Sequence, residues 1–308
     1  MLVGFKKYAR TVSGSILIVL LTQALSSCFS KFVWSDEKTD KFYRQKPYRP
    51  VYHFLEHNGK QIHYAEFGNH SKPLLILIHG APGAWYTWRN IIDLDTIRSN
   101  FHIIAIDRPG YGKSGGGKFE PQISVQIEMV QQIINQYPGK EIYLAGRSYG
   151  APIATALASQ NKLRTRRLLL YSPVLSPFHE KTYWFSSLGK KRLIRRLLPD
   201  AMNVATDEKF AHLSQMKTLL QVYPGVEAET CIISGDKDWV AHPENFKVSD
   251  SLLCNAKKCS VLVKNNGHFL TFLYPKSMSM AIYEPFCSDF AERLTASLIK
   301  EGNSKENR

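Results

Sequence analysis

The sequence is poor in cysteine and in acidic residues, and it has only one long apolar run. Five cysteines among 308 residues are too few for a dense disulfide scaffold. Only 26 Asp and Glu stand against 40 Lys and Arg, which gives a formal net charge of +14. This surplus favours contact with anionic surfaces but says little about the fold. Apolar residues make up 44% of the chain, enough for a large core, which excludes a disordered or fibrous protein.

The apolar run lies near the N-terminus and is too short to cross a membrane. Residues 12–25 are uncharged and mostly apolar, and they follow a segment that contains Lys6, Lys7 and Arg10 but no acid. A helix of this length rises about 21 Å, whereas the hydrocarbon core measures about 30 Å. A basic start before a short apolar run is the layout of a signal peptide, so we expect residues 1–27 to be removed. The remaining chain would carry a net charge of +11, because the removed segment holds three basic residues.

The end of this run resembles the bacterial lipoprotein box. Residues 25–28 read LSSC, and the resemblance implies that Cys28 is lipidated and becomes the first residue of the mature chain. Ordinary secretion and an uncleaved anchor are the alternatives. Phe29 follows the cysteine in place of Asp, which by the same resemblance favours the outer membrane. We therefore expect a lipid-anchored protein of the cell envelope that faces the periplasm or the exterior, with residues 28–49 as the lipidated cysteine and a polar tether.

Beyond the tether, strand and helix patterns alternate along the chain. Alternating segments on either side of Asn58-Gly59 predict a hairpin. Solid apolar runs predict strands that are buried on both faces. Strands that alternate with helices form a mostly parallel sheet with helices on both faces, which is the α/β class. The expected strands are 51–55, 61–67, 74–78, 101–106, 142–145, 168–171, 231–234 and 261–264, and the expected helices are 85–98, 123–134, 151–159 and 286–299.

The alternation divides the chain into a core in two parts and an insert. The core covers residues 50–177 and 229–300, and residues 301–308 form a polar tail. Residues 178–228 contain no good strand, so we interpret them as a small helical lid. A basic cluster in this lid has leucines interleaved with Lys190, Lys191, Arg192, Arg195 and Arg196.

The basic cluster has two interpretations. It is either a solvated helix face or a surface that contacts anionic lipid headgroups through Lys190, Arg195 and Arg196. Binding of nucleic acid is not expected from an exported protein.

One motif in the core is typical of a catalytic serine. Residues 146–150 read GRSYG and match G-x-S-x-G. A buried strand precedes them and a helix of small residues follows, which is the context of a nucleophile elbow. In this sharp turn the glycines are needed because neighbouring side chains would clash. Ser148 is therefore the candidate nucleophile.

A second match to the same pattern lacks this context. Residues 112–116 read GKSGG, but Ser114 lies eight residues beyond the preceding strand and more glycine follows in place of a helix. The Gly-Lys-Ser sequence here also suggests a phosphate-binding loop. Such a loop would need glycine at position 107, which is Asp107, so an NTPase is excluded.

A nucleophilic serine needs a base, and the base needs an acid to orient it. His268 follows the last expected strand and Asp238 follows the strand before it. Both therefore lie at the carboxyl ends of strands, where open α/β sheets place their sites. The chain order Ser148, Asp238, His268 is the order of this type of triad. Asp236 is the alternative acid, although we expect it to hold the loop together.

These patterns together resemble the α/β-hydrolase superfamily over roughly residues 50–300. The resemblance implies Ser148 as nucleophile, His268 as general base and acid, and Asp238 as its orienting acid. It also implies an oxyanion hole made by the backbone N–H groups of Ala81 and Tyr149. The motifs that carry it are HGAPG at 79–83, DRPGYG at 107–112, GRSYG at 146–150, GDKD at 235–238 and GH at 267–268.

The loop at residues 79–83, called the oxyanion loop because it contains Ala81, narrows the type of hydrolase that the sequence resembles. It does not read HGGG, as in many lipases, and it is closer to the HGxPG loop of capped esterases, peptidases and epoxide-type hydrolases. Members of the family with an Asp nucleophile are disfavoured, because position 148 is Ser.

Three further residues are candidates for a substrate pocket, and each has a plainer interpretation. Trp85 either lines a pocket or packs its helix on the sheet. Arg147 either attracts an anionic group of the substrate or supports the elbow. Trp184 of the lid is a candidate for the acyl pocket. His79, at the end of its strand, is expected to be a structural hydrogen-bonding residue.

The cysteines after Cys28 leave one question open. Cys254 and Cys259 either form a local disulfide, as an oxidising compartment permits, or stay free. Cys231 is expected in a buried strand and Cys287 in a helix. No cysteine spacing predicts a zinc site, and no metal or cofactor is expected.

The function expected from the sequence is a serine hydrolase that cleaves a carboxylic ester through an acyl-enzyme. An ester is favoured because no amide-specific pocket can be read from the sequence. The alternatives on the same fold are an amidase or aminopeptidase and a C–C bond hydrolase. A silent envelope binding protein is the alternative of another class, since a fold alone does not prove turnover.

Overall fold

The computed structural model describes residues 34–183, 186–286 and 288–306, and the chain divides into two units at residue 45. In the first unit the described residues form α2 (Asp36–Arg44). The hydroxyl of Ser35 accepts a hydrogen bond from the amide of Lys38 and caps this helix. The segment expected to be a polar tether therefore contains a helix. The predicted signal peptide and Cys28 lie outside the described residues.

No helix in the described ranges is both long enough and apolar enough to span a membrane.

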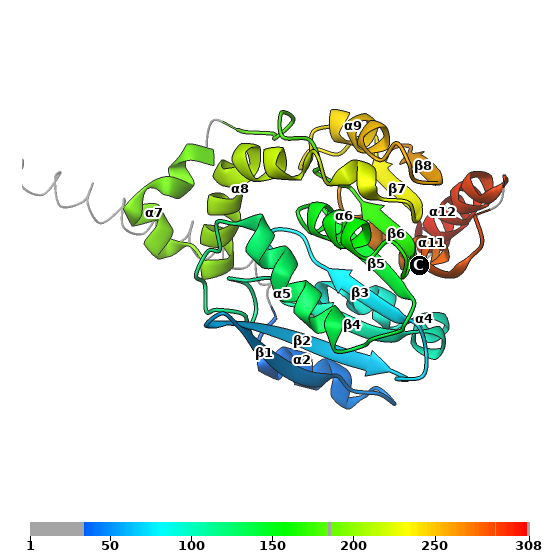
Figure 1. Ribbon diagram of the computed structural model, residues 1–308, viewed down its shortest axis with the longest axis horizontal. Helices are drawn as coiled ribbons and strands as arrows, with labels where there is room; N and C mark the ends of the chain where they lie inside the picture. Colours follow the sequence, from blue (N-terminus) through cyan, green and yellow to red (C-terminus); the bar gives the residue numbers. More distant parts are fainter. Residues whose placement is uncertain (1–33, 184–185, 287, 307–308) are drawn as a thin grey trace, which may run out of the picture. The chain divides into compact units, whose positions relative to one another are not determined.

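The second unit is built on an eight-stranded sheet with the order β1-β2-β4-β3-β5-β6-β7-β8 (Figure 1). The first three of these strands pair antiparallel and the rest pair parallel. This is the expected α/β-hydrolase fold. The strands are β1 (Val51–His57), β2 (Lys60–Gly68), β3 (Leu74–Ile78), β4 (His102–Ile106), β5 (Ile142–Arg147), β6 (Thr165–Tyr171), β7 (Glu229–Gly235) and β8 (Lys258–Val263).

Local sequence explains these strands. Asn58 and Gly59 both have positive φ, at 50° and 70°, which gives the turn of the β1–β2 hairpin the twist that its strands require. Every residue of β3 and of β4 is buried, as the solid apolar runs predicted. The predicted hairpin and the predicted buried strands are confirmed.

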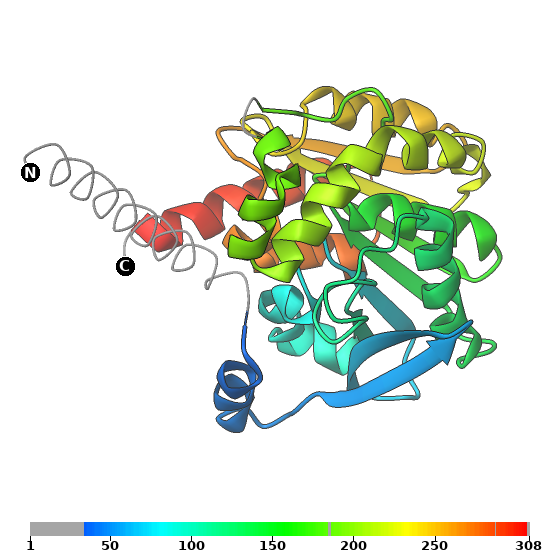
Figure 2. The ribbon, with the colours of Figure 1, turned by 90° about the vertical axis from the view of Figure 1, so that its left-hand side faces the viewer.

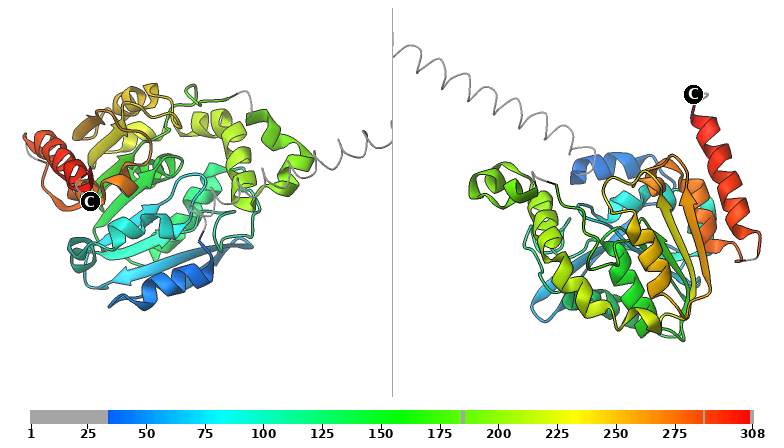
Figure 3. Two further views of the ribbon diagram at one scale, coloured as in Figure 1. Left: turned by 180° about the vertical axis from the view of Figure 1, so that it is seen from behind. Right: turned by 90° about the horizontal axis from the view of Figure 1, so that it is seen from above.

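Helices cover both faces of the sheet (Figures 1 and 3). One face carries α5 (Ile123–Asn135), α6 (Gly150–Gln160) and α9 (Glu244–Leu252). The other face carries η1 (Trp85–Trp88), α3 (Arg89–Ile92), α4 (Asp95–Asn100), α10 (Leu270–Leu273), α11 (Pro275–Tyr283) and α12 (Phe290–Glu306). The single helix expected over 85–98 is thus three short ones.

The insert between β6 and β7 is helical, as expected for the lid (Figure 2). Its longest helix has 20 residues and lies on the α6 side of the sheet. The elements of the insert are η2 (Ser186–Lys190), α7 (Arg192–Leu197), α8 (Asp200–Leu219) and η3 (Tyr223–Gly225).

The C-terminal end differs from the expectation. α12 continues to Glu306, so most of the expected polar tail is helical. The reason is a tertiary contact, because the carboxylate of Glu301 accepts hydrogen bonds from the amide and the hydroxyl of Ser277 at 2.9 and 2.8 Å. Glu301 thereby caps the first turn of α11 and ties α12 to it.

The cysteines of the described residues are free, so the local disulfide between Cys254 and Cys259 is not formed. Cys259 lies on β8, where it is directly opposite Cys231 of β7, and Cys254 is exposed in the preceding turn. Cys287 lies outside the described residues.

Candidate active site

Ser148 occupies a sharp turn between β5 and α6. Its φ is +52°, in the left-handed region that side chains rarely adopt. The turn is tight, because a Cβ on Gly146 would lie 2.5 Å from the carbonyl oxygen of Gly150. A Cβ on Gly150 would lie 2.3 Å from the carbonyl oxygen of Ile78. The expected elbow is therefore present, and only glycine fits on either side of the serine.

His268 and Asp238 form the second part of the site. Nδ1 of His268 lies 2.7 Å from Oδ2 of Asp238, and both side chains are buried. The other carboxylate oxygen accepts the amides of Val240 and Ala241 at 2.8 and 2.9 Å. With its Nδ1–H donated to Asp238, the imidazole has Nε2 available to take a proton.

The electrostatics keep this carboxylate ionised. Burial alone would raise the pKa of Asp238, but the hydrogen bond and the positive charge from His268 outweigh it. The amides of Ala241 and Val240 act in the same direction, so the pKa lies below its usual value. An ionised Asp238 would stabilise a positive charge on the imidazole of His268.

The ends of neighbouring strands hold the serine and the histidine in place. The amide of Ser148 donates to the carbonyl of Tyr171 at the end of β6. The next residue, Ser172, donates its amide to Ile233 of β7 and its hydroxyl to the carbonyl of His268, at 3.3 Å. The loops after β5, β6 and β8 are therefore joined, as expected for residues at the same edge of a parallel sheet.

The loop at 79–83 runs directly over the nucleophile. A Cβ on Gly80 would lie 2.9 Å from Cβ of Ser148. His79 holds this loop, because its Nδ1 lies 2.6 Å from the carbonyl oxygen of Gly80 and its Nε2 accepts the amide of Arg108 at 2.9 Å. The loop thus lies where an oxyanion hole would be needed. The roles of the Ala81 and Tyr149 amides in that hole stay a prediction.

His79 is buried, and its environment keeps it neutral. Burial and then the charge of Arg108 lower the pKa of His79 well below its usual value. Both ring nitrogens take part in the contacts that fix the loop, which is the structural role expected for this residue.

The serine of the second G-x-S-x-G sequence is buried and holds a loop in place. Ser114 is fully buried, and its hydroxyl donates to the carbonyl of Asp107 and accepts the amide of His63, both at 2.7 Å. The carboxylate of Asp107 accepts the amides of Trp85 and Lys113 at 2.8 and 3.0 Å. These bonds hold the 107–114 loop. Asp236 has a comparable role in the next loop, where it accepts the amide of Asn266.

The residues proposed for a substrate pocket have different environments. Trp85 contacts the rings of Tyr52, Phe67 and Tyr86, which are the contacts of a packing residue. Trp184 lies outside the described residues.

Arg147 is buried beneath the elbow. Its Nη1 donates to the hydroxyl of Thr271 at 3.1 Å, and its guanidinium lies over the rings of Phe272 and Trp88. Burial and then the charge of Arg89 lower its pKa to about 9. A role in attracting an anionic substrate group stays a prediction.

One connection between lid and core was missed by the sequence analysis. Glu208 of α8 forms a fully buried ion pair with Arg108, with Oε1 2.5 Å from Nη1 and Oε2 3.0 Å from Nη2. The hydroxyl of Tyr111 donates to the same carboxylate at 2.7 Å. Burial alone would lower the pKa of Arg108, but the charge of Glu208 outweighs it and raises the pKa. Charge patterning along the chain holds no signal for this pair, because its members are 100 residues apart.

The chain has the α/β-hydrolase fold, and Ser148, Asp238 and His268 lie at the carboxyl ends of strands of its sheet. A family model described as alpha/beta hydrolase fold matches residues 73–193. Epoxide hydrolase 3 of Xenopus tropicalis is 25% identical over 191 residues, which cover 59% of this chain and 50% of that protein. The chain thus spans about half the length of this relative. These matches show that the chain is similar to α/β hydrolases.

Solved structures agree with the fold over most of the chain. A membrane phospholipase A described as a bacterial virulence factor has a TM-score of 0.58 at 20% identity, covering 96% of this chain and 99% of its own. A haloalkane dehalogenase from Bradyrhizobium elkani has a TM-score of 0.55 at 16% identity, covering 83% and 100%. At such identities the likeness shows the fold alone.

Proposed function

We propose that this chain is a serine hydrolase that cleaves a carboxylic ester through an acyl-enzyme. The observation that carries the proposal is a serine at a strained elbow together with an imidazole that is oriented by a buried carboxylate at 2.7 Å. A serine in this setting suits nucleophilic attack on a carbonyl carbon. Members of the fold that use an Asp nucleophile are disfavoured, because position 148 is Ser.

In the proposed reaction, Oγ of Ser148 attacks the ester carbonyl while Nε2 of His268 takes its proton. The oxyanion is stabilised by the amides of Ala81 and Tyr149, and two such donors can contribute several kcal/mol. The imidazolium then returns the proton to the leaving alcohol, and the acyl-enzyme forms. Water, deprotonated by His268, releases the acid and restores the serine.

A fluorophosphonate probe tests whether the serine is activated. The full chain should be labelled and Ser148→Ala should not. Ser114→Ala is the matched control, because it removes the serine of the other G-x-S-x-G sequence, and it should still be labelled. Each variant is checked by circular dichroism. A folded parent that takes no label would contradict the proposal and favour a silent binding protein.

Substrate class is tested separately on protein that has not been treated with the probe. We expect turnover of short-chain carboxylic esters in preference to matched amides, and loss of turnover in Ser148→Ala. Preferred cleavage of an amide would favour an amidase or aminopeptidase. Conversion of an epoxide to a diol that persists in Ser148→Ala would contradict the serine mechanism.

We also propose that the protein is held in the cell envelope by a lipid on Cys28. The support is the sequence LSSC after a basic start and a short apolar run. Mass spectrometry of the membrane fraction should find a diacylated N-terminal cysteine, and Cys28→Ser should abolish it. An unmodified Cys28 in the membrane fraction would contradict this proposal.

A second proposal is that the lid binds to the surface of an anionic lipid bilayer. On α7, Leu193 and Leu197 expose 69% and 47% of their surface, and Arg192 and Arg196 are exposed beside them. An apolar pair next to basic residues complements anionic headgroups in charge and the bilayer interface in polarity. Arg195 is not part of this surface, because both of its Nη atoms bond to Asp207 at 2.8 Å.

Hydrolysis of one ester substrate on two kinds of vesicle tests the lid surface. Activity should be higher on vesicles containing phosphatidylglycerol than on pure phosphatidylcholine. The rise should be lost in the double variant Leu193→Ser with Arg196→Glu. Leu163→Ser changes a leucine that is 96% exposed outside the lid and serves as control. A rise that survives the double variant would overturn the proposal.

A further inference from the structure

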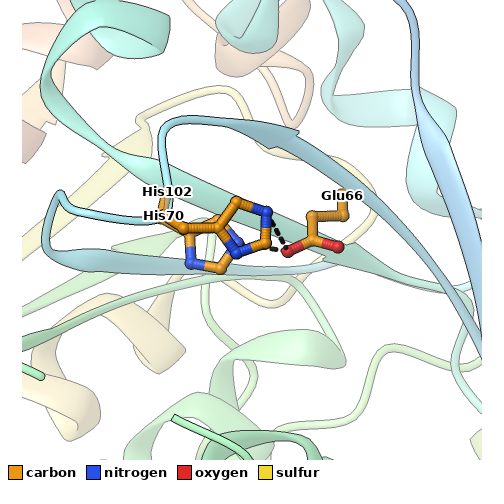
Figure 4. A group of neighbouring side chains, drawn as sticks. All are labelled: Glu66, His70 and His102. Carbon is orange, nitrogen blue, oxygen red and sulfur yellow. Dashed lines mark hydrogen bonds and ion pairs between the residues drawn. The ribbon is translucent and has the colours of Figure 1, made fainter. Parts of the chain in front are cut away.

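Two imidazoles and a carboxylate converge at the edge of the sheet (Figure 4). Glu66 lies on β2, His70 follows that strand, and His102 is the first residue of β4. Nε2 of His70 lies 3.4 Å from Oε1 of Glu66, and Nε2 of His102 forms a short hydrogen bond with the same oxygen. One nitrogen or oxygen from each of the three residues lies within 4.8 Å of the others.

A third imidazole lies on the other carboxylate oxygen. Nε2 of His53 on β1 lies 2.5 Å from Oε2 of Glu66. Three imidazoles of the described residues therefore contact the carboxylate of Glu66.

The donor atoms fit a metal ion of intermediate softness. Imidazole nitrogen together with carboxylate oxygen suits zinc and its neighbours in the first transition series. In a tetrahedral site with bonds of about 2.0–2.2 Å, donors lie roughly 3.3 Å apart. The separation of 3.4 Å between His70 and Glu66 already matches this spacing, whereas the shorter contact between His102 and Glu66 would have to lengthen.

We propose that Glu66, His70 and His102 bind a divalent transition-metal ion of the zinc type. The site lies far from the catalytic serine, because His102 begins β4 whereas Ser148 follows the end of β5, which runs in the same direction. The ion joins the β2–β3 loop to β4. Its role is therefore to stabilise this edge of the sheet and not to take part in the reaction.

Lys140 provides an internal test of the proposal. Its Nζ lies 3.1 Å from Nδ1 of His102 and donates to the carbonyls of Lys72 and His70. An ammonium group at this distance from a ligand opposes a bound cation. Removing its charge in Lys140→Gln should therefore tighten metal binding, whereas a merely structural histidine cluster predicts no such gain.

Calorimetric titration of the EDTA-treated full chain with Zn²⁺ alone tests the site. We expect one ion per chain, a thermal unfolding temperature that rises with Zn²⁺, and no comparable binding of Mg²⁺. Ser148→Ala should bind Zn²⁺ like the parent. His70→Ala should weaken binding at least tenfold, and Lys140→Gln should tighten it severalfold. His70 is 71% exposed in its side chain, so its replacement leaves the core intact.

His57→Ala is the matched control. His57 pairs with Glu128 at 2.6 Å outside the cluster, so this variant removes one histidine beside one carboxylate. It should bind Zn²⁺ with the affinity of the parent. The proposal is overturned if Zn²⁺ does not bind at a defined stoichiometry, if His70→Ala binds as tightly as the parent, or if Lys140→Gln binds more weakly.

Discussion

Glu208 of the lid and Arg108 of the core form a two-pronged ion pair with no exposed atom on the arginine side chain. The same guanidinium donates from Nε to the carbonyl of His79 and packs on the ring of Tyr149, the residue after the nucleophile. Arg108 therefore contacts the lid, the oxyanion loop and the elbow at once. The position of the lid is thereby coupled to the two loops that surround Ser148.

Breaking this pair should be strongly destabilising. In Glu208→Gln the guanidinium stays buried without its counter-ion, which typically costs about 3–5 kcal/mol. We expect the free energy of unfolding, measured with urea, to fall by that amount, and the proposed ester hydrolysis to slow with it. Glu227→Gln is the control, because its exposed pair with Lys162 should cost no more than about 1 kcal/mol. Equal effects of the two variants would refute the coupling.

Asp238→Asn should separate catalysis from stability. An amide at this position can no longer accept the Nδ1–H of His268 as a carboxylate does, so the imidazole is held in the wrong tautomer. A loss in kcat of about 10⁴-fold is expected. The fold should persist, because the amide oxygen can still accept from Val240 and Ala241. Asp236→Asn should keep an activity near that of the parent. This comparison identifies which of the two aspartates is the acid of the triad.

Acid should destabilise the protein below about pH 6.5. The pKa of His79 and of His212 is lowered in the folded state, first by burial in both cases. Between the folded and unfolded pKa values only the unfolded chain binds these protons. Stability is therefore complete above the unfolded pKa and is lost as pH falls, by up to about 1.4 kcal/mol per pH unit for each histidine. Urea unfolding at pH 7.5, 6.5 and 5.5 measures the slope.

His212→Gln shows how much of this change of stability with pH comes from His212. Gln can donate to the carbonyl of Ser176, as Nε2 of His212 does at 2.8 Å, but it does not titrate. Its stability should therefore fall less steeply between pH 6.5 and 5.5. A slope identical to that of the parent would contradict the role assigned to His212.

Gly150 at the start of α6 and Gly302 within α12 should respond oppositely to alanine. Gly150→Ala places a Cβ 2.3 Å from the backbone of β3 and should unfold the elbow, with loss of probe labelling at Ser148. A Cβ on Gly302 of α12 would lie 3.7 Å from Cε1 of Tyr274, an ordinary contact, so Gly302→Ala should stabilise the helix by up to about 1 kcal/mol. Thermal unfolding of both variants measures the contrast.

Much of the candidate site could be predicted from local sequence. A run such as Leu74–Ile78 is buried on both faces wherever its sheet packs, and Asn58-Gly59 favours one kind of turn. Glycines on both sides of Ser148 specify the elbow, because no other residue fits there. The chain order of Ser148, Asp238 and His268 then places all three at one edge of a parallel sheet.

Other features were decided only by the tertiary structure. The pairing of Arg108 with Glu208 and the contact of Glu66 with His102 join residues that are far apart in sequence, so no spacing reveals them. The helical end of α12 depends on the contact of Glu301 with Ser277. Strand register places Cys259 opposite Cys231, while Cys254 stays exposed. Burial patterns and turn residues are properties of neighbours along the chain, whereas register, capping between helices and buried charge pairs depend on which segments the packed fold brings together.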